Sequence, residues 1–277
     1  MLKQASRPSS NLTEAFQSFG WAVAPIFDAQ DLDAFIDTLH DVVRMQMRKL
    51  RLESTGKIDD DVIRLNGKSS TALNECLQMV RNTSIGHRLA SSTKLNDLAA
   101  QFLHDDKDLH KRLLISGPSF FINIPDTNER KYTWHSEQNW YPKRRNFLNV
   151  WCPIIHHRTN KDSMGVMSGS HAKDWFYFSE YSGYDGTFDD KANVQYEIPE
   201  SFLTDYKPET PSVKIGEGLF FNGRLVHRSL DNKASHPLYT IVFRAFDYSE
   251  DLTLSSNWAD IPYNRKSMGY PEINVKP

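Results

Sequence analysis

The periodicity of the apolar residues changes near residue 113, and this change limits the possible folds more than any other feature of the sequence. Beyond this point, short runs rich in aromatic and branched residues alternate with turn residues, a composition that favours half-buried strands. The runs are LLISGPSFFINI, YTWHSE, FLNVWCPII, MGVMSG, GEGLFFNG, LVHRSL and YTIVFRAF. Many short, mostly antiparallel strands predict a mainly β fold, either a barrel or a two-sheet jelly roll.

The first third of the chain is predicted to be mostly helical. Asp28 is a predicted N-cap, and helical spacing of the apolar residues after it predicts a helix over 29–50. Similar patterns predict helices over about 68–81 and 93–104, and GWAVAPIF before Asp28 predicts a short strand. We expect one domain over 1–277, with a helical lead-in (1–112) flanking a jelly-roll core (113–250), followed by a C-terminal extension (251–277).

Composition and charge exclude several classes of protein. No stretch approaches the roughly 18 uninterrupted apolar residues that a membrane-spanning helix needs. A net charge of −2 and a pI near 6.6 give no reason to expect nucleic acid or a membrane as a partner. Cys76 and Cys152 form no CxxC pair, and the first residues lack the apolar segment of a secretion signal. These features predict a cytoplasmic protein with reduced thiols.

The run YTWHSEQNWY places His135 two residues before Glu137. On a strand, residues two apart point to the same face, so the imidazole and the carboxylate would converge. Together with a second histidine they would form the 2-His-1-carboxylate triad that binds Fe(II) and leaves coordination positions open. His227, near the end of GEGLFFNGRLVHRSL, is the best-placed second histidine.

The remaining histidines are weaker candidates, and an H-x-E pair also occurs often by chance. His156 and His157 are adjacent, so on a strand they point to opposite faces and cannot bind one ion together. His171 lies in a predicted turn, and His236 precedes a proline.

Four motifs in a fixed order give a more specific signal. WHSEQNWY, FLNVWCPI, MGVMSGSHAKDW and GEGLFFNGRLVHRSLDN resemble, in this order, the motifs of the phytanoyl-CoA dioxygenase (PhyH-like) family of Fe(II)/2-oxoglutarate-dependent oxygenases. The similarity covers most of residues 113–246. It implies a double-stranded β-helix core of the jelly-roll or cupin-like type, with Fe(II), 2-oxoglutarate and O₂ as cofactor and cosubstrates.

The resemblance also assigns roles to individual residues. His135, Glu137 and His227 would be the metal ligands, although the family more often has aspartate where Glu137 stands. Halogenating relatives have a small residue at this position, so a carboxylate here favours oxygenation. Near the iron, the cosubstrate pocket would contain several further residues: Ser229, Trp151, and with weaker support Asn149 and Tyr141. Trp140 is as well explained by a place in the core or at the rim.

One position departs from the family pattern. The family usually has an arginine eleven residues after the distal histidine, where it grips the far carboxylate of 2-oxoglutarate, but this position is Leu238 here. Arg244 lies on the same strand face, about 20 Å further along an extended strand. It is the first candidate for the anchor, unless it pairs with a structural carboxylate such as Asp247 or Glu217. Other nearby cations are alternatives: Arg145, Arg144, Lys131 and Arg112.

The sequence therefore predicts a 2-oxoglutarate-dependent dioxygenase that hydroxylates a small molecule and releases succinate and CO₂. Aromatic and cationic residues in WHSEQNWYPKRR and in 174–186 are expected to line the mouth, which favours a polar or anionic substrate. A non-catalytic or differently metallated jelly-roll binding protein is the alternative, and Leu238 is the feature that favours it. The oligomeric state is left open.

Overall fold

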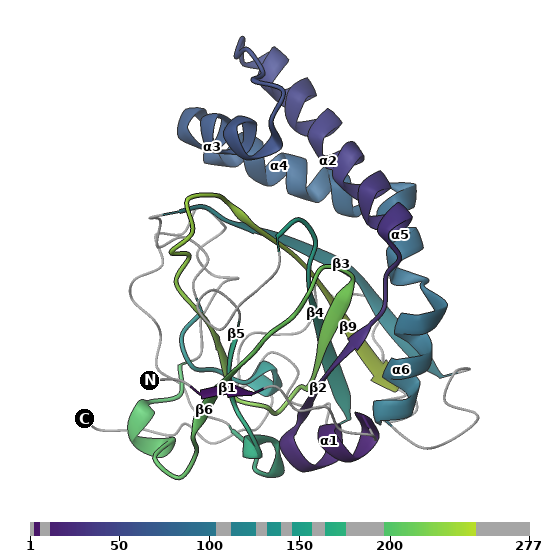
Figure 1. Ribbon diagram of the computed structural model, residues 1–277, viewed down its shortest axis with the longest axis vertical. Helices are drawn as coiled ribbons and strands as arrows, with labels where there is room; N and C mark the ends of the chain where they lie inside the picture. The colour runs from purple at the N-terminus through teal and green to yellow at the C-terminus, as the bar shows by residue number, and fades with distance from the viewer. Residues whose placement is uncertain are drawn as a thin grey trace, which may run out of the picture.

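A computed structural model describes residues 3–5, 12–103, 112–125, 132–139, 146–156, 164–175 and 197–247. Its β-strands form two sheets with the helices packed outside (Figure 1). The five-stranded sheet has the order β2 (Trp21–Pro25), β7 (Glu217–Asn222), β4 (Phe147–Pro153), β9 (Leu238–Asp247), β3 (Leu113–Asn123). The four-stranded sheet has the order β1 (Lys3–Ala5), β6 (Pro208–Pro211), β5 (Met164–Met167), β8 (His227–Ser229). The predicted jelly-roll class is confirmed.

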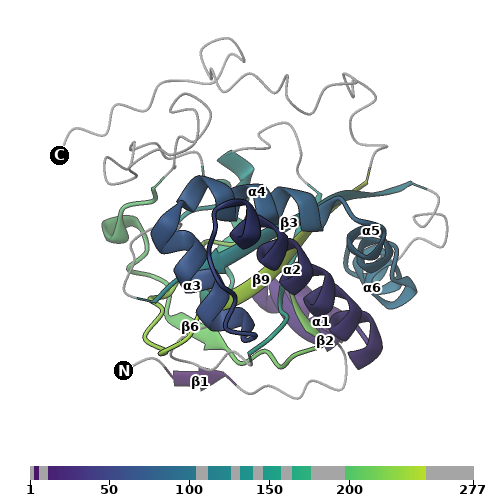
Figure 2. The ribbon, with the colours of Figure 1, turned by 90° about the horizontal axis from the view of Figure 1, so that it is seen from above.

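Six α-helices precede β3 in the described chain, with β2 between α1 and α2, and they cover one face of the five-stranded sheet (Figures 1 and 2). They are α1 (Leu12–Phe19), α2 (Ala29–Lys49), α3 (Ile58–Lys68), α4 (Ser70–Arg81), α5 (Ser84–Ala90) and α6 (Thr93–Leu103). The three predicted helices correspond to α2, α4 and α6. No helix in the described ranges is long and apolar enough to cross a membrane.

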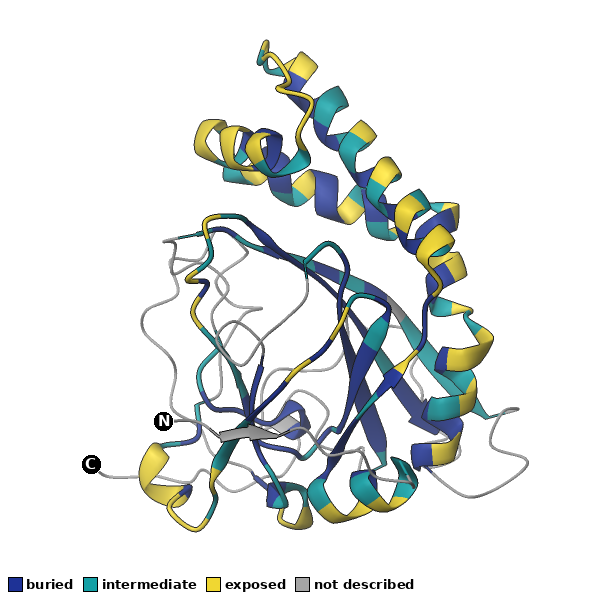
Figure 3. Ribbon diagram, in the orientation of Figure 1, coloured by how far each residue is buried: buried dark blue, intermediate teal, exposed yellow. Residues whose placement is uncertain are grey.

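Strand alternation separates two apolar layers, and strands such as β4 and β9 are buried along almost their whole length (Figure 3). On β9, Tyr239, Ile241, Phe243 and Ala245 join the core beneath the helices, whereas Val242 points to the layer between the sheets. The same alternation on β4 and β7 places Trp151, Leu219 and Phe221 in the inner layer. Inner-facing polar residues on these strands are therefore available for chemistry between the two sheets.

Two local expectations need correction. Asp28 occupies the N-cap position of α2, but its side chain does not cap the helix; its carboxylate binds Lys94 Nζ at 2.8 Å, because the ammonium offers a charged partner. The run YTWHSE is not a strand: His135 makes one isolated bridge, and the short 3₁₀ helix η2 (Glu137–Asn139) follows at once. The division at residues 112 and 250 stays a prediction, and the expected extension 251–277 lies outside the described residues.

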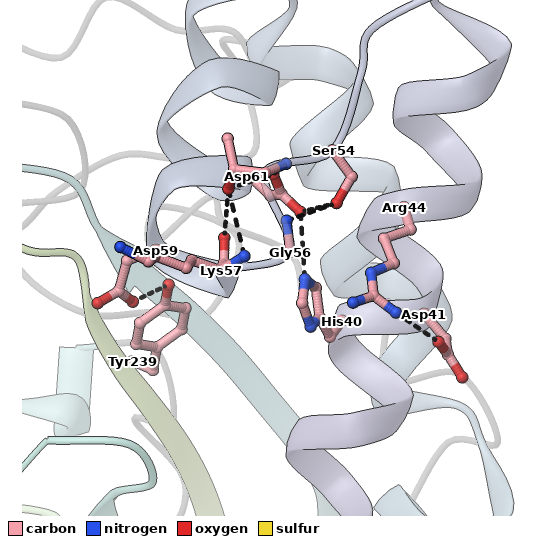
Figure 4. Close-up of polar contacts among 10 residues, drawn as sticks. His40, Asp41, Arg44, Ser54, Gly56, Lys57, Asp59, Asp61 and Tyr239 are labelled. Carbon is pink, nitrogen blue, oxygen red and sulfur yellow. Dashed lines mark hydrogen bonds and ion pairs between the residues drawn. The ribbon is translucent and has the colours of Figure 1, made fainter.

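The loop between α2 and α3 is folded around one buried carboxylate (Figure 4). Asp61 accepts hydrogen bonds from Ser54 Oγ at 2.5 Å, from Thr55 N at 2.7 Å and from Thr55 Oγ1 at 3.0 Å, and lies 3.1 Å from His40 Nε2. Burial alone would raise the pKa of Asp61, but these hydrogen bonds hold it below its ordinary value. The cluster fixes the start of α3, from which Asp59 extends to Tyr239 on β9.

Candidate metal centre

The backbone brings the two predicted histidine ligands side by side. His135 and His227 exchange both backbone hydrogen bonds, with N···O distances of 3.0 and 2.9 Å, and their ring centroids are 4.1 Å apart. His227 begins β8, whereas the chain turns away after His135 into η2. Glu137 therefore reaches the histidines from a 3₁₀ turn rather than from the strand face that the H-x-E spacing predicts.

The turn at Glu137 is fixed by a carbonyl that lies far along the chain. Ser136 Oγ and Gln138 N both donate to the Gly223 carbonyl, each at 3.1 Å. The buried Gln138 side chain then accepts from Trp175 N and donates to Asp174 Oδ1, at 3.0 and 2.8 Å. The buried polar groups of this segment find their hydrogen-bond partners within the turn and not in a neighbouring β-strand, which is why no strand continues here.

The donor atoms of His135, Glu137 and His227 all lie within 4.8 Å of one another, and all three residues are buried. The Nδ1 atom of His135 lies 2.6 Å from the Thr133 carbonyl, and that of His227 lies 2.9 Å from the Leu225 carbonyl. A carbonyl only accepts, so each Nδ1 carries the proton and each Nε2 keeps its lone pair. This is the arrangement typical of histidines that bind a metal through Nε2.

Arg244 contacts the carboxylate of this cluster. Its Nε donates to Glu137 Oε2 at 3.0 Å, while Glu137 Oε1 lies 3.9 Å from His227 Nε2. Arg244 Nη1 also donates to Ser119 Oγ at 3.5 Å. Among the described residues, the carboxylate that pairs with Arg244 is thus that of the candidate ligand itself.

The two carboxylates named as structural partners for Arg244 are engaged elsewhere. Asp247 pairs with Arg112, whose Nε lies 3.4 Å from Asp247 Oδ1, and Glu217 accepts from Lys214 N at 2.8 Å. The other alternative cations, Lys131, Arg144 and Arg145, lie outside the described residues.

Burial sets the protonation of the cluster. Burial lowers the pKa of His135, and burial together with the neighbouring His135 lowers the pKa of His227 to about 3. Burial would raise the pKa of Glu137, but the Arg244 guanidinium holds it below its ordinary value. At neutral pH the cluster therefore holds two neutral imidazoles and one ionised carboxylate, the protonation that metal binding requires.

The inner face of β4 carries two of the predicted pocket residues. Asn149 pairs across the sheet with Phe221 and Arg244, and its fully buried amide has no hydrogen-bond partner for either polar atom among the described residues. Trp151 follows on the same face in the apolar layer between the sheets. An unsatisfied buried amide beside Arg244 indicates a place for a polar ligand or for water.

The other predicted residues are distributed as follows. Ser229 lies on β8 two residues after His227, half-buried, and its backbone N donates to the Tyr132 carbonyl at 3.0 Å. Leu238 is buried at the start of β9 opposite Asn123. Tyr141 and Trp140 lie outside the described residues, as does most of the expected substrate mouth.

Sequence comparison identifies the family. The profile of the family described as phytanoyl-CoA dioxygenase (PhyH) matches residues 20–237, which is most of the chain. The chain belongs to the phytanoyl-CoA dioxygenase family. The predicted resemblance is confirmed, and with it the cofactor class of this family: Fe(II), 2-oxoglutarate and O₂. Among curated proteins, none matches the chain in sequence.

Solved structures share the fold of this PhyH-family chain at low sequence identity. EctD from S. alaskensis, solved with 2-oxoglutarate and 5-hydroxyectoine, has a TM-score of 0.58 and 15% identity, covering 90% of this chain and 81% of its own. The non-heme alpha ketoglutarate dependent epimerase SnoN from nogalamycin biosynthesis has a TM-score of 0.54 and 14% identity, covering 85% and 82%. The non-heme monooxygenase ThoJ, in its Ni complex, has a TM-score of 0.53 and 12% identity, covering 86% and 77%. The general type is therefore an Fe(II)/2-oxoglutarate oxygenase-family protein, whereas the activities of these neighbours differ from one to the next.

Proposed function

We propose that this protein is a 2-oxoglutarate-dependent dioxygenase that hydroxylates a polar small molecule, with His135, Glu137 and His227 as its metal ligands. The observation that carries the proposal is the buried cluster itself: two neutral imidazoles with Nε2 available and one carboxylate, all within 4.8 Å. This donor set suits a divalent iron ion with open coordination positions.

The charges of the site support the binding of a dianion together with the metal. The buried Glu137 carboxylate and the half-buried Arg244 guanidinium form an ion pair of zero net charge beside two neutral histidines. A dication alone would leave this buried site with a net charge of +2, which is costly in a low-dielectric environment. A dicarboxylate such as 2-oxoglutarate would restore neutrality, so we propose that the metal binds first and the cosubstrate second.

The protein side chains position the reactants and exclude water. Arg244 holds Glu137 in place and supplies the positive charge of the pocket, while Asn149, Trp151 and Ser229 form its proposed walls. Bound Fe(II), with 2-oxoglutarate and O₂, supplies the oxidising power for an unreactive C–H bond, and the protein contributes binding, orientation and a dry site. In this account no side chain acts as a general base, so the buried histidines need no proton exchange.

The substrate class is proposed from the aromatic and cationic residues around WHSEQNWYPKRR. Among the described residues, Arg228 lies over the Trp134 ring at 4.5 Å, and this pair shows how a cation and an indole stack next to His135. The neighbour SnoN has been solved in complex with nogalamycin RO, and EctD with 5-hydroxyectoine, both small molecules. We therefore propose a polar or anionic small molecule as the substrate.

Succinate release during a screen of polar small molecules tests the proposal, and ¹⁸O₂ labelling of the product identifies the reaction. Hydroxylation places one labelled oxygen in the product, whereas epimerisation, the activity named for SnoN, leaves the product unlabelled. Labelled product from the wild type and none from His135→Ala would support the proposal. Succinate that forms with an unlabelled, rearranged product would contradict hydroxylation.

Leu238 favours a second candidate, a jelly-roll protein that binds a metal or ligand without catalysis. It is buried and uncharged where the family usually has the arginine that grips 2-oxoglutarate. Anaerobic titration with 2-oxoglutarate separates the two candidates, because the non-catalytic protein would bind Fe(II) with the same affinity whether or not 2-oxoglutarate is present.

A further inference from the structure

A second cluster of metal-binding side chains lies outside the candidate metal centre. Asp59, His156 and His236 each place a donor atom within 4.8 Å of the other two, and all three are half-buried. Asp59 comes from the first turn of α3, His156 from the segment after β4, and His236 from the loop before β9. The fold thus brings together three donors that are far apart in sequence.

This cluster belongs to the helix-covered side of the five-stranded sheet. Its neighbour Tyr239 packs into the core beneath the helices, and Figure 4 shows its hydroxyl directed at Asp59 of α3. Arg244, five residues further along β9, faces the layer between the sheets, where Glu137 lies. Because odd and even residues of a strand point to opposite faces, the two clusters lie on opposite sides of one sheet.

The distances suit two ligands of one ion. His156 Nε2 lies 3.2 Å from Asp59 Oδ2, and the rings of His156 and His236 have centroids 3.8 Å apart. Two donors bound tetrahedrally to zinc at ordinary bond lengths are about 3.3 Å apart. An ion that replaces the proton shared by His156 Nε2 and Asp59 Oδ2 would therefore contact all three residues after small side-chain rotations.

Two hydrogen bonds prepare the donors. The buried Tyr239 hydroxyl donates to Asp59 Oδ1 at 2.7 Å, which leaves Oδ2 directed to His156. His236 Nδ1 lies 3.2 Å from the Pro237 carbonyl, so this nitrogen carries the proton and Nε2 keeps its lone pair. Carboxylates and histidines that bind metals are usually oriented in this way by neighbouring groups.

We propose that Asp59, His156 and His236 form a second metal site, which binds a zinc-class divalent ion and links α3 to the five-stranded sheet. Two imidazoles and one carboxylate, with water in the fourth position, match the ligands that Zn²⁺ prefers, and such sites bind Zn²⁺ more tightly than Fe²⁺. The ion binds only the folded chain, because its ligands come from three distant segments, and it therefore stabilises the fold.

The test is a Zn²⁺ titration of the chelator-treated full chain carrying His227→Ala, which weakens the candidate metal centre. One equivalent should bind, and it should be lost when His236→Ala or Asp59→Asn is added. His87→Ala and Asp60→Asn are the matched controls, because both residues are exposed and lie outside the cluster. Each control should keep the full equivalent.

Tyr239→Phe provides a graded test. It keeps all three ligands but removes the hydrogen bond to Asp59, so Zn²⁺ should still bind with an affinity about 10- to 100-fold weaker. Zn²⁺ should also raise the melting temperature of the His227→Ala chain, and His236→Ala should abolish this increase. If the His227→Ala chain binds no Zn²⁺, or if Asp59→Asn and His236→Ala leave the bound equivalent unchanged, the second site does not exist.

Discussion

Replacement of Arg244 by leucine tests how the candidate metal centre uses charge. The substitution removes the charge-assisted hydrogen bond from Arg244 Nε to Glu137 Oε2 at 3.0 Å, the longer one to Ser119 Oγ at 3.5 Å, and the positive charge on the inner face of β9. Such a bond contributes about 1.5–3 kcal/mol. For a bound dicarboxylate, the loss should weaken 2-oxoglutarate binding by at least about 2 kcal/mol, roughly thirtyfold.

The effect of the same variant on Fe(II) should be smaller, because two contributions oppose each other. Without Arg244 the pKa of buried Glu137 rises and its carboxylate is held less firmly, which weakens metal binding. At the same time a positive charge that repels the cation disappears, which strengthens metal binding. We expect the Fe(II) affinity to change by less than about tenfold, since each contribution is of the order of a charge-assisted hydrogen bond.

Anaerobic calorimetry, first with Fe(II) and then with 2-oxoglutarate at saturating Fe(II), measures the two affinities separately. Arg112→Leu is the matched control, because Arg112 pairs with Asp247 and not with Glu137. An Arg244→Leu chain that binds 2-oxoglutarate as tightly as the wild type would refute the charge-balance argument. If Arg112→Leu instead causes the thirtyfold loss, the anchor has been assigned to the wrong arginine.

Substitutions at three further positions test other parts of the structure. Glu137→Asp should keep part of the Fe(II) affinity because the donor type is unchanged, whereas Glu137→Gln should lose most of it in the same calorimetric titration. Asp61→Asn should lower the free energy of unfolding by about 2 kcal/mol at pH 7, because four donors lose a charged acceptor. The pKa of Asp61 is depressed in the folded wild type, so the carboxylate stabilises the fold less as it becomes protonated. The stability difference between the wild type and Asp61→Asn should therefore shrink in denaturant titrations as the pH falls below about 4. Gly223→Ala should cost about 1–3 kcal/mol in the same assay, since a Cβ there would lie 2.1 Å from Phe147 Cζ in the core.

Matched controls accompany these variants. Asp60→Asn, at an exposed neighbour of Asp61, should change stability by less than about 0.5 kcal/mol. Gly67→Ala lies in α3 with open space around it and should stabilise the protein by about 0.5–1 kcal/mol. Equal iron binding by Glu137→Gln and the wild type, a deficit in Asp61→Asn that grows at low pH, or an unchanged stability of Gly223→Ala would each contradict the corresponding argument.

Elements with a clear apolar period could be predicted from the sequence. The helix α2 and the strands β4, β7 and β9 follow such patterns, because one face or both faces of each are buried. The helix α3 was missed, since its sequence IDDDVIRLNGK is largely polar and contains Gly67. The helix can bury Asp61 because the preceding loop supplies hydrogen-bond donors, and the spacing of apolar residues gives no sign of these donors.

The candidate site was predictable by residue type but not by local structure. An H-x-E spacing fits both a strand face and a 3₁₀ turn, and the choice depends on the Gly223 carbonyl, far away in sequence. The sequence was likewise compatible with several partners for Arg244. The pairing of β9 with β4 and β3 brings its side chain to Glu137 and Ser119. Ser119, Ser136 and Gln138 carried no recognisable signal, because their roles arise from contacts between distant segments.

Anaerobic Fe(II) titration tests most directly the claim that His135, Glu137 and His227 hold the metal. The Asp59→Asn chain is the appropriate parent, because the second cluster then contributes no iron. We predict one equivalent of Fe(II) in this parent and in its His87→Ala control, and none in its His135→Ala or His227→Ala variants, with all chains folded by circular dichroism. A full equivalent of iron in either His135→Ala or His227→Ala would contradict the proposed metal centre.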